Sequence, residues 1–325
     1  MIDFLQGDVF DNIKKLDDNS IDCVVTSPPY WGLRDYGVPG QLGLEPTYQE
    51  HIKNIVELFR AMKPKLKDSA TIWLNYGDSY AATVNGTKVK DQVKNKVQFA
   101  SKYLIKGDDR TFRDKPFSTI QGSIKPKDLV MIPNRIAIAL QDDGWWIRSE
   151  IIWHKPNPMP ESTKDRPTQC HEKIWLITKS KKYYYDAEAV REPCQDETIR
   201  RMTLGNKGKV GNNKNSTGWK QLNNYWGSEQ SVKDANKGRN RRNVWTITTK
   251  PFKDAHFATF PKDLIEPCIK AGCPKGGIVL DPFGGAGTTG IVAQSLNRTA
   301  ILIELNPEYI EIAKKRIDKE LGMFK

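Results

Sequence analysis

Short apolar runs alternate with segments of helical periodicity along much of the chain. Five of the runs predict buried strands, namely Ile2–Leu5, Ile21–Val25, Ala70–Leu74, Ile278–Leu280 and Ala300–Ile303. Between the second and the third, apolar residues recur every three or four positions from His51 to Met62, which predicts a helix that ends before Pro64. Helices between strands are typical of a parallel sheet with crossover connections. We therefore expect an α/β fold with a doubly wound, mostly parallel sheet.

Other segments fit the same frame. The pattern predicts helices at Val9–Leu16, Asp128–Leu140, Lys262–Ala271 and Tyr309–Leu321, and one that runs through to Leu296. It also predicts strands at Trp145–His154 and Lys173–Ile177, the second extended by Tyr183–Tyr185. Between these strands, Lys155–Gln169 holds four prolines and is expected to be a long loop.

Two polar, basic segments interrupt the pattern. Ser79–Lys125 has ten Lys or Arg against four Asp, and Arg191–Asn243 has twelve against five acidic residues. Together they carry thirteen net positive charges, slightly more than the +12 of the whole chain, so the apolar frame is close to neutral. The second segment also contains nine asparagines and three large aromatic residues, a composition that suits phosphate contacts and reading of base edges. Disordered surface loops with incidental lysines are the alternative.

The remaining composition excludes several classes of protein. With 325 residues the chain can build a full core. It has no apolar run of about eighteen residues, and Met1–Asp8 lacks the features of a signal peptide, so we expect no membrane span and a cytoplasmic location. The five cysteines include no Cys-x-x-Cys pair, and the four histidines form no ligand pattern. These features indicate a reducing compartment and no metal site.

A rigid polar turn follows the strand Ile21–Val25. In Thr26-Ser27-Pro28-Pro29-Tyr30-Trp31 the two prolines fix φ and remove two backbone donors, and Ser27 is held extended because it precedes a proline. The turn therefore presents a hydroxyl, free carbonyl groups and an aromatic ring. A planar base could stack on Tyr30 while its amino group donates to Ser27 Oγ and to the Pro28 carbonyl. For Pro28-Pro29 taken alone, a stiff turn without a ligand is the alternative.

A glycine-rich loop follows the strand Ile278–Leu280. Residues 281–290 read Asp-Pro-Phe-Gly-Gly-Ala-Gly-Thr-Thr-Gly, and Glu304 lies 19 residues beyond Gly285. This matches the dinucleotide-binding pattern of a loop and a ribose-binding acid. Two features oppose a nicotinamide cofactor: no second nucleotide-binding half fits after residue 278, and the Asp281 carboxylate would repel a pyrophosphate. S-adenosyl-L-methionine has a ribose, a sulfonium and an ammonium but no phosphate. Glu304 would bind its ribose, and Asp281, expected outside the core, would face its methionine part.

Polar residues follow several of the predicted strands at their carboxyl ends. These residues are Asp8, Ser27, Asp78, Asp281 and Glu304. In a parallel sheet such ends lie along one edge, where ligands bind. A helix N-cap for Val9–Leu16 is an equally compatible role for Asp8.

The two loops and their order resemble the β group of the amino-methylating DNA methyltransferases. Thr-Ser-Pro-Pro-Tyr near the start is similar to the catalytic motif of that family, and the glycine-rich loop near the end is similar to its cofactor loop. Gly7-Asp8 resembles a short acidic motif, and His256–Pro261 resembles the cofactor-binding segment that precedes the glycine strand. The resemblance covers residues 1–78, 126–190 and 244–325, which would form one catalytic domain with a circularly permuted motif order. Residues 79–125 would be a basic inserted loop region, and 191–243 a target-recognition region.

The resemblance implies a Rossmann-like, site-specific enzyme that moves a methyl group from S-adenosyl-L-methionine to an exocyclic amine of a base flipped out of double-stranded DNA. It assigns catalytic roles to Ser27, Pro28, Pro29 and Tyr30. The cofactor-binding residues that it implies are Asp8, His256, Phe260, Asp281, Phe283, Gly284, Gly285, Gly287, Thr288 and Glu304.

In this family a Ser at position 27 usually accompanies methylation of cytosine N4, and Asp or Asn usually accompanies adenine N6. We therefore favour cytosine N4, with the same chemistry on adenine N6 as the alternative. RNA or protein methylation and a catalytically inactive DNA-binding protein are less favoured. A cognate restriction endonuclease as a partner, the recognition sequence and the oligomeric state are left open by the sequence.

Overall fold

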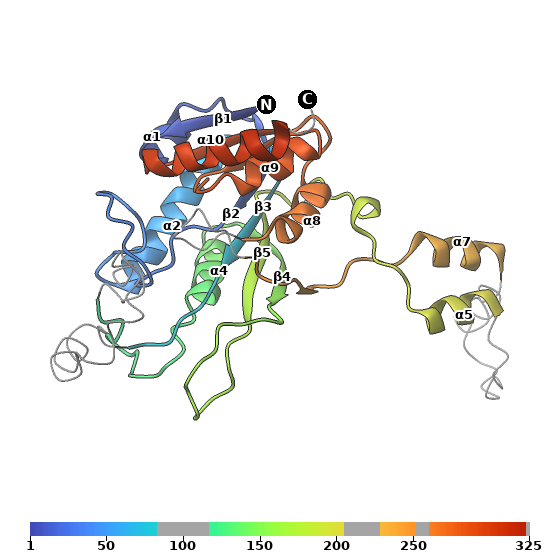
Figure 1. Ribbon diagram of the computed structural model, residues 1–325, viewed down its shortest axis with the longest axis horizontal. Helices are drawn as coiled ribbons and strands as arrows, with labels where there is room; N and C mark the ends of the chain where they lie inside the picture. The colour runs from blue at the N-terminus through green and yellow to red at the C-terminus, as the bar shows by residue number, and fades with distance from the viewer. Residues whose placement is uncertain (83–116, 205–227, 251–259, 323–325) are drawn as a thin grey trace. The chain divides into compact units, whose positions relative to one another are not determined.

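An eight-stranded sheet, in the order β1-β8-β7-β2-β3-β5-β4-β6, organises the part of the chain that the structure describes. Strands β1 to β5 are labelled in Figure 1. This computed structural model describes residues 1–82, 117–204, 228–250 and 260–322. The strands are β1 Ile2–Gln6, β2 Ile21–Thr26, β3 Leu66–Tyr76, β4 Trp146–His154, β5 His171–Thr178, β6 Val244–Thr246, β7 Ile278–Asp281 and β8 Thr299–Glu304.

Helices connect most of these strands. They are α1 Val9–Lys14, α2 Tyr48–Met62, α4 Ile132–Asp142, α5 Asp196–Leu204, α7 Glu229–Lys237, α8 Lys262–Gly272, α9 Thr288–Ser295 and α10 Pro307–Leu321, with a 3-10 turn at Glu188–Val190. The start of α2 is fixed by a capping box, in which Thr47 Oγ1 accepts from the Glu50 N–H and the Glu50 carboxylate accepts from the Thr47 N–H. None of the helices in the described ranges is long and apolar enough to cross a bilayer.

The parallel half of the sheet is permuted in chain order. β7 and β8, near the end of the chain, lie between β1 and β2, and β1-β8-β7-β2-β3 are all parallel. From β7 the chain continues through α9 to β8 on one side, and from β2 it continues through α2 to β3 on the other. The direction of winding therefore reverses between β7 and β2, and the carboxyl ends of these neighbours border the crevice where ligands bind in open α/β sheets. The predicted doubly wound, mostly parallel sheet is confirmed.

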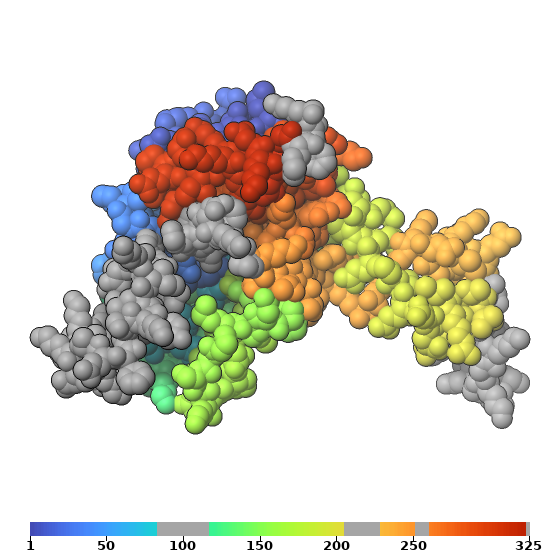
Figure 2. Space-filling model, viewed as in Figure 1, coloured from blue at the N-terminus to red at the C-terminus, as the bar shows by residue number. Residues whose placement is uncertain are grey.

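Helical layers cover the two faces of the sheet. α1, α2 and α4 pack in succession on one side, and α8, α9 and α10 pack together on the other, where their orange and red atoms adjoin in Figure 2. All six residues of β2 are buried, as expected for a central strand covered on both faces. The central strands therefore provide a rigid base for the loops at their carboxyl ends.

The other edge of the sheet differs from the sequence prediction. β5 pairs antiparallel with both β3 and β4, and the short strand β6, which the pattern did not predict, is parallel to β4. The expected extension of β5 through Tyr183–Tyr185 is wrong because the strand ends at Thr178. A bend at residues 179–182 interrupts the ladder, and beyond it the Tyr184 N–H makes one bond to the Ser69 carbonyl of β3 (2.8 Å) without forming a strand. Likewise, α4 starts at Ile132 instead of Asp128, after Met131 in the left-handed conformation.

The described chain divides into two compact units. One contains Met1–Tyr185 and Asn243–Lys325, and the other contains Asp186–Arg242. Within the smaller unit, α5 packs on α7, and the Ser231 hydroxyl donates to the Met202 carbonyl (2.7 Å). The sequence pattern did not predict these two short helices, because each has only nine residues and both are strongly polar.

Candidate active site at the sheet edge

The two motifs identified in the sequence meet where the winding reverses. Thr26, the last residue of β2, donates its hydroxyl to Asp281 Oδ1 (2.9 Å), at the end of the neighbouring strand β7. Ser27 and the glycine loop therefore begin side by side, although 254 residues separate Ser27 from Asp281 in the sequence. This contact joins the candidate catalytic loop to the candidate cofactor loop.

Asp281 lies inside the protein, with 1% of its surface exposed, and not outside the core as we expected. Oδ1 also accepts from the Phe283 N–H (3.1 Å), and Oδ2 accepts from the Thr289 hydroxyl (2.6 Å). Burial raises the pKa of this carboxyl to about 6, although the hydrogen bonds from Thr289, Phe283 and Thr26 act in the opposite direction. Asp281 therefore holds both ends of the glycine turn, in addition to any contact it makes with a ligand.

The glycine turn needs glycine for steric reasons. Gly285 and Gly287 have φ of 47° and 74°, the left-handed region that side chains rarely adopt. A Cβ on Gly284 would lie 2.9 Å from Leu302 Cβ. Phe283 is half-buried at the start of the turn, and α9 begins at the buried Thr288. The main chain thus passes close to β8 and then turns into α9 at the edge of the crevice.

Glu304 and Asp8 lie at the ends of the paired strands β8 and β1. Each oxygen of Glu304 accepts one backbone N–H, from Gly285 (2.9 Å) and from Asn306 (2.9 Å). Burial raises the pKa of Glu304 against these hydrogen bonds. Asp8 Oδ1 caps α1 by accepting from the Phe10 and Asp11 N–H groups, whereas Oδ2 has no hydrogen-bond partner among the described residues. The N-cap role considered for Asp8 is observed, and one oxygen remains for a ligand.

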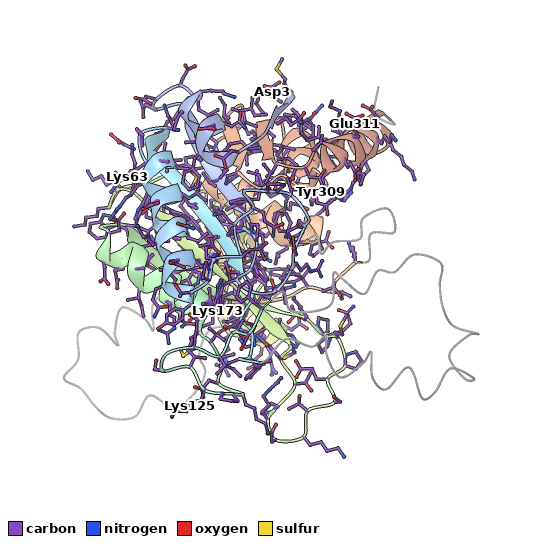
Figure 3. All side chains as sticks on the ribbon, turned by 90° about the vertical axis from the view of Figure 1, so that its left-hand side faces the viewer. Asp3, Lys63, Lys125, Lys173, Tyr309 and Glu311 are labelled. Atoms are coloured by element: carbon purple, nitrogen blue, oxygen red, sulfur yellow. The ribbon has the colours of Figure 1, made fainter. Side chains whose placement is uncertain are left out.

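Two tyrosines beside Glu304 were missed by sequence reasoning. Tyr36, in the loop after the Ser-Pro-Pro-Tyr turn, lies edge to face on Tyr309 of α10, with 6.5 Å between ring centroids. Burial raises the pKa of both hydroxyls, to about 12 for Tyr309, and the charge of Glu304 raises both further. On α10, Tyr309 faces the frame and Glu311 faces solvent (Figure 3). Lone aromatic residues in a loop and on a helix provided no signal, because only the fold brings them together.

The arrangement fits S-adenosyl-L-methionine. Each Glu304 oxygen retains a lone pair for a hydroxyl donor such as those of a ribose. The Tyr36–Tyr309 pair adds an aromatic surface, and acids at three strand ends suit a ligand with a sulfonium and an ammonium group. Of the other predicted residues, Phe260 is half-buried just before α8, and His256 lies outside the described residues.

The Ser-Pro-Pro-Tyr turn is tied to a polar cluster on β3 and β5. Ser27 Oγ donates to Tyr30 Oη (3.2 Å), and Tyr30 Oη donates to Glu172 Oε2 (2.9 Å). Asn75 Nδ2 donates to the same Glu172 oxygen (3.1 Å), and Lys155 forms an ion pair with the other. Burial and the neighbouring carboxylate hold the pKa of Tyr30 well above its usual value, so the phenol is neutral.

One face of the Tyr30 ring is already occupied. Tyr76 stacks on it with 4.4 Å between centroids, so a base would have to use the other face. Gly77 makes the approach of Tyr30 possible, since a Cβ there would lie 2.8 Å from Tyr30 Cε2 and 3.2 Å from Glu172 Cγ. Nothing in the sequence pattern indicated this role for Asn75-Tyr76-Gly77.

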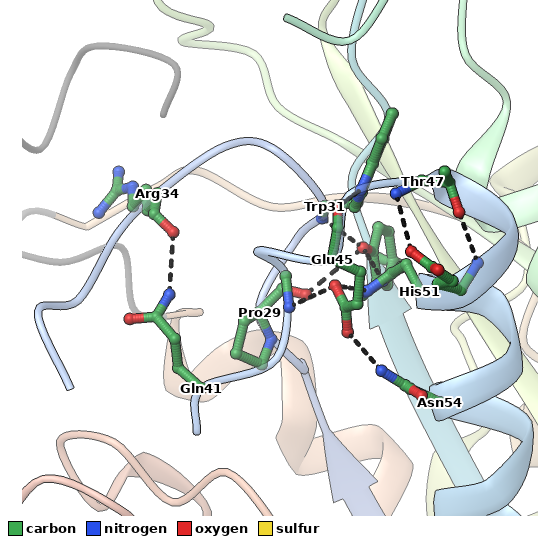
Figure 4. Close-up of polar contacts among 11 residues, drawn as sticks. Pro29, Trp31, Arg34, Gln41, Glu45, Thr47, His51 and Asn54 are labelled. Carbon is green, nitrogen blue, oxygen red and sulfur yellow. Dashed lines mark hydrogen bonds and ion pairs between the residues drawn. The ribbon is translucent and has the colours of Figure 1, made fainter. Parts of the chain in front are cut away.

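A buried brace holds the turn from behind (Figure 4). The Trp31 N–H donates to Tyr76 Oη (2.8 Å), which also contacts His51 Nε2 (2.8 Å), while His51 Nδ1 contacts Glu45 Oε2 (2.8 Å). His51 is fully buried. Burial by itself would raise the pKa of Glu45, but its interaction with His51 brings the pKa below its usual value. The brace fixes the backbone just after Tyr30.

Asp78 serves a different part of the structure. Its Oδ1 accepts from the Ser79 N–H (2.9 Å) and the Ile132 N–H (3.3 Å), so it fixes the start of α4. Burial raises its pKa. It lies at the predicted edge of the sheet, but the described contacts of Oδ1 are structural.

Comparison with known proteins agrees with this geometry. Residues 21–315 match the N6_N4_Mtase family, described as DNA methylase. The chain belongs to this family. The Type II methyltransferase M.Cfr9I of Citrobacter freundii is 43% identical over 315 residues, 97% of this chain and 87% of that protein. M.SmaI of Serratia marcescens is 43% identical over 311 residues, 96% and 89% of the two chains. The predicted amino-methyltransferase of restriction-modification type is therefore confirmed.

Solved structures share the fold at lower identity. The PvuII DNA methyltransferase (cytosine-N4-specific) has a TM-score of 0.60 and 17% identity, with 99% of this chain and 91% of that chain covered. The Thermus thermophilus protein TTHA0409, complexed with S-adenosyl-L-methionine, has a TM-score of 0.56 and 21% identity, with 99% and 96% covered. The predicted fold of S-adenosylmethionine-dependent DNA methyltransferases is thus confirmed.

Proposed function

We propose that this DNA methyltransferase transfers a methyl group from S-adenosyl-L-methionine to the N4 amine of a cytosine flipped out of duplex DNA. The observation that carries the proposal is the contact between Thr26 and Asp281, which places Ser27 next to the glycine loop. S-adenosyl-L-methionine, when bound, supplies an electrophilic methyl group. The protein then has to hold a base amine in line with it, and such positioning accounts for a large share of catalysis in reactions of this kind.

The residues of the turn have separate tasks in this proposal. Because the Ser27 hydroxyl donates to Tyr30, the lone pairs of Ser27 Oγ remain available to accept from the amine. The Pro28 carbonyl is the second acceptor in this proposal. The face of Tyr30 opposite Tyr76 would stack on the base, which is worth about 1–3 kcal/mol and offsets part of the cost of flipping.

The same site supports a second candidate, methylation of adenine N6. Ser27 and a carbonyl group can accept from either amine, so the loop geometry accommodates both bases. We favour cytosine because Ser27 replaces the acidic or amide side chain that usually accompanies adenine in the resembled family. Cytosine is also the base named for the PvuII enzyme, which shares the fold.

Double-stranded DNA is the proposed substrate, and the smaller unit is the proposed reader of its sequence. Asp186–Arg242 contains α5 and α7 with arginines and lysines at exposed positions such as Arg200, Arg201 and Lys237. Basic and amide side chains of this kind contact phosphates and base edges. The residues of the basic inserted region that lie in 83–116 are outside the described part. A cytoplasmic location and a cognate endonuclease stay predictions.

A direct assay tests the proposal. The protein is incubated with labelled S-adenosyl-L-methionine and duplex DNA, and the nucleosides are separated by mass spectrometry. We expect N4-methylcytosine at a defined sequence. N6-methyladenine would retain the site and overturn the choice of base, and label on RNA or protein alone would overturn the DNA substrate.

A further inference from the structure

A chain of hydroxyl groups leads from the candidate amine-binding atom into the protein. Ser27 Oγ donates to Tyr30 Oη (3.2 Å), which donates to Glu172 Oε2 (2.9 Å). The alternative acceptor for Tyr30, Asn75 Oδ1, is farther away at 3.4 Å and neutral. Hydrogen bonds to a carboxylate are shorter and stronger than those to a neutral oxygen, so the tyrosine proton points at Glu172. Both hydroxyls are thereby oriented in the same direction, away from the crevice.

Glu172 is well placed as the end of this chain. Its side chain is only 17% exposed, and it extends from β5, the strand next to β3. Asn75 Nδ2 donates to the same oxygen that accepts from Tyr30, and Lys155 binds the other oxygen. These contacts fix a carboxylate, which is a proton acceptor, at the end of the hydrogen-bonded chain that runs from Ser27 through Tyr30. The turn itself contains no group of comparable basicity.

We propose that Glu172 takes up the proton that methyl transfer displaces, through Tyr30 and Ser27. The inference rests on the proposed function, because it requires the target amine to lie against Ser27. As the N–CH3 bond forms from the nitrogen lone pair, the C–S bond of the methyl donor breaks, its electron pair stays on sulfur, and the amine carries one proton too many. That proton moves to Ser27 Oγ, the Ser27 proton moves to Tyr30 Oη, and the Tyr30 proton moves to Glu172 Oε2. Every hydroxyl is neutral before and after, and Glu172 ends as the neutral acid.

The raised pKa of Tyr30 is compatible with this route. Because this phenol resists ionisation, it does not become a phenolate in the proposed route. It donates its own proton to Glu172 as it accepts one from Ser27. Tyr30 therefore has two separable roles, with its ring stacking on the base and its hydroxyl passing the proton. Glu172 touches the reacting atoms only through Tyr30 and Ser27.

Two single variants, their double variant and one control variant test the route. Glu172→Gln keeps the size and one acceptor oxygen but cannot take the proton, and Tyr30→Phe keeps the ring but breaks the chain in the middle. Glu150→Gln is the matched control, because Glu150 likewise pairs with a lysine, Lys173 of β5 (2.6 Å), and receives no hydroxyl. The measurements are single-turnover methylation in H2O and D2O, calorimetric binding of S-adenosyl-L-methionine and of duplex DNA, and thermal unfolding.

The expected result separates this role from a structural one. Glu172→Gln and Tyr30→Phe should each slow the methyl-transfer step about 100-fold, the lower end of what a positioned proton acceptor contributes. Both should lose the slowing that D2O causes in the native protein, and the double variant should be no slower than the slower single variant. Cofactor and DNA affinity should stay near native, and Glu150→Gln should behave like the native protein. In the free native protein, proton NMR should show a downfield, exchange-protected Tyr30 hydroxyl, which moves upfield in Glu172→Gln.

Two results would overturn the route while leaving the proposed function intact. One is a native rate of methyl transfer in Glu172→Gln, which would mean that the proton leaves directly to solvent. The other is slower methyl transfer in Glu172→Gln with an unchanged effect of D2O, which would mean that Glu172 only positions Tyr30. A native protein that fails to methylate DNA would instead overturn the proposed function on which the inference rests.

Discussion

At the scale of single residues, several side chains of the candidate site make structural contacts in addition to the chemical roles proposed for the site. Asp281 accepts from three donors inside the protein, and it is the last residue of β7, next to the proposed cofactor loop. Tyr76 supports the Ser-Pro-Pro-Tyr turn through a hydrogen bond and through stacking on Tyr30. Substitutions at these positions therefore need readouts that distinguish stability from activity.

Asp281→Asn should change how stability depends on pH. The folded pKa of about 6 lies above the ordinary value of 3.8, so between these values the unfolded chain ionises while the folded protein stays protonated. The free energy of unfolding of the native protein should therefore fall by up to about 3 kcal/mol as pH rises through this window. Above the window this decrease should stay constant. Asn does not titrate, and its Oδ1 can accept from Thr26 and Phe283, whereas the Thr289 hydroxyl has to turn and accept from the Asn amide group. In urea unfolding from pH 4 to 8, the stability of the variant relative to the native protein should increase as pH rises.

Asp3→Asn is the control for that series, because Asp3 is an exposed aspartate on β1. Calorimetry on the same samples should show weaker binding of S-adenosyl-L-methionine in Asp281→Asn, since a negative charge near a cationic ligand is lost. A stability difference that does not vary with pH would contradict the assigned burial of the charge. Unchanged cofactor affinity would limit Asp281 to the fold.

Tyr76→Phe should loosen the catalytic turn without affecting the cofactor site. The variant keeps the ring that stacks on Tyr30 but leaves the Trp31 N–H without its acceptor, at a cost of about 1–3 kcal/mol. We expect a lower kcat for methylation and native affinity for S-adenosyl-L-methionine. Tyr183→Phe, which removes a hydroxyl that contacts the exposed Arg148 (3.3 Å), is the matched control. Native kcat in Tyr76→Phe would show that the brace does not position the turn.

At the scale of elements, the cofactor loop depends on how closely β7, α9 and α10 approach one another. Gly287 has a φ of 74°, and a Cβ there would lie 3.1 Å from Ala313 Cβ and 3.2 Å from Ile317 Cδ1, both on α10. Gly276, between α8 and β7, has a φ of 77° but no atom within 4 Å of its added Cβ. The two positions thus share the same backbone strain and differ in their neighbours.

Gly287→Ala should therefore weaken cofactor binding more than Gly276→Ala. Both should be destabilised by about 1–2 kcal/mol because of the left-handed conformation. Only Gly287→Ala has to move α10, and with it Tyr309 beside Glu304. Calorimetry with S-adenosyl-L-methionine and thermal unfolding measure the two effects. Equal cofactor affinity in the two variants would mean that the approach of α10 does not shape the site.

At the scale of the whole molecule, the described residues divide cofactor binding and proposed DNA reading between two units. All described residues assigned to the cofactor and to the catalytic turn lie in Met1–Tyr185 and Asn243–Lys325. The smaller unit, Asp186–Arg242, has its own packing between α5 and α7. Its removal is therefore expected to spare the catalytic frame.

Replacing residues 186–242 by a short Gly-Ser linker should leave binding of S-adenosyl-L-methionine near native and abolish sequence preference. Methylation of a mixed-sequence duplex pool, mapped by sequencing, reads the preference. Replacing lysines in Ser79–Lys125 by glutamine is the comparison, which should lower affinity for all DNA and flatten its salt dependence. If the lysine replacements abolished sequence preference and the removal of residues 186–242 did not, the roles assigned to the two segments would be reversed.

The sequence by itself determined the parallel half of the fold and the two loops of the site. Buried central strands leave long apolar runs, and Pro-Pro and Gly-rich turns are conformationally restricted, so both kinds of feature are visible in a single sequence. Strand order could not be predicted in the same way. That β5 runs antiparallel between β3 and β4 depends on pairings between distant segments, which the pattern of a single strand does not encode.

Only the tertiary structure decided how the site residues cooperate. Tyr36 and Tyr309 meet across 273 positions, and Glu172 reaches Tyr30 across 142, without any local motif that marks them. Whether Asp281 is exposed or buried also depends on Thr26 and Thr289, which lie on different elements. Local sequence sets backbone preference and burial pattern, whereas partners for a polar side chain are chosen by the packing of the whole sheet.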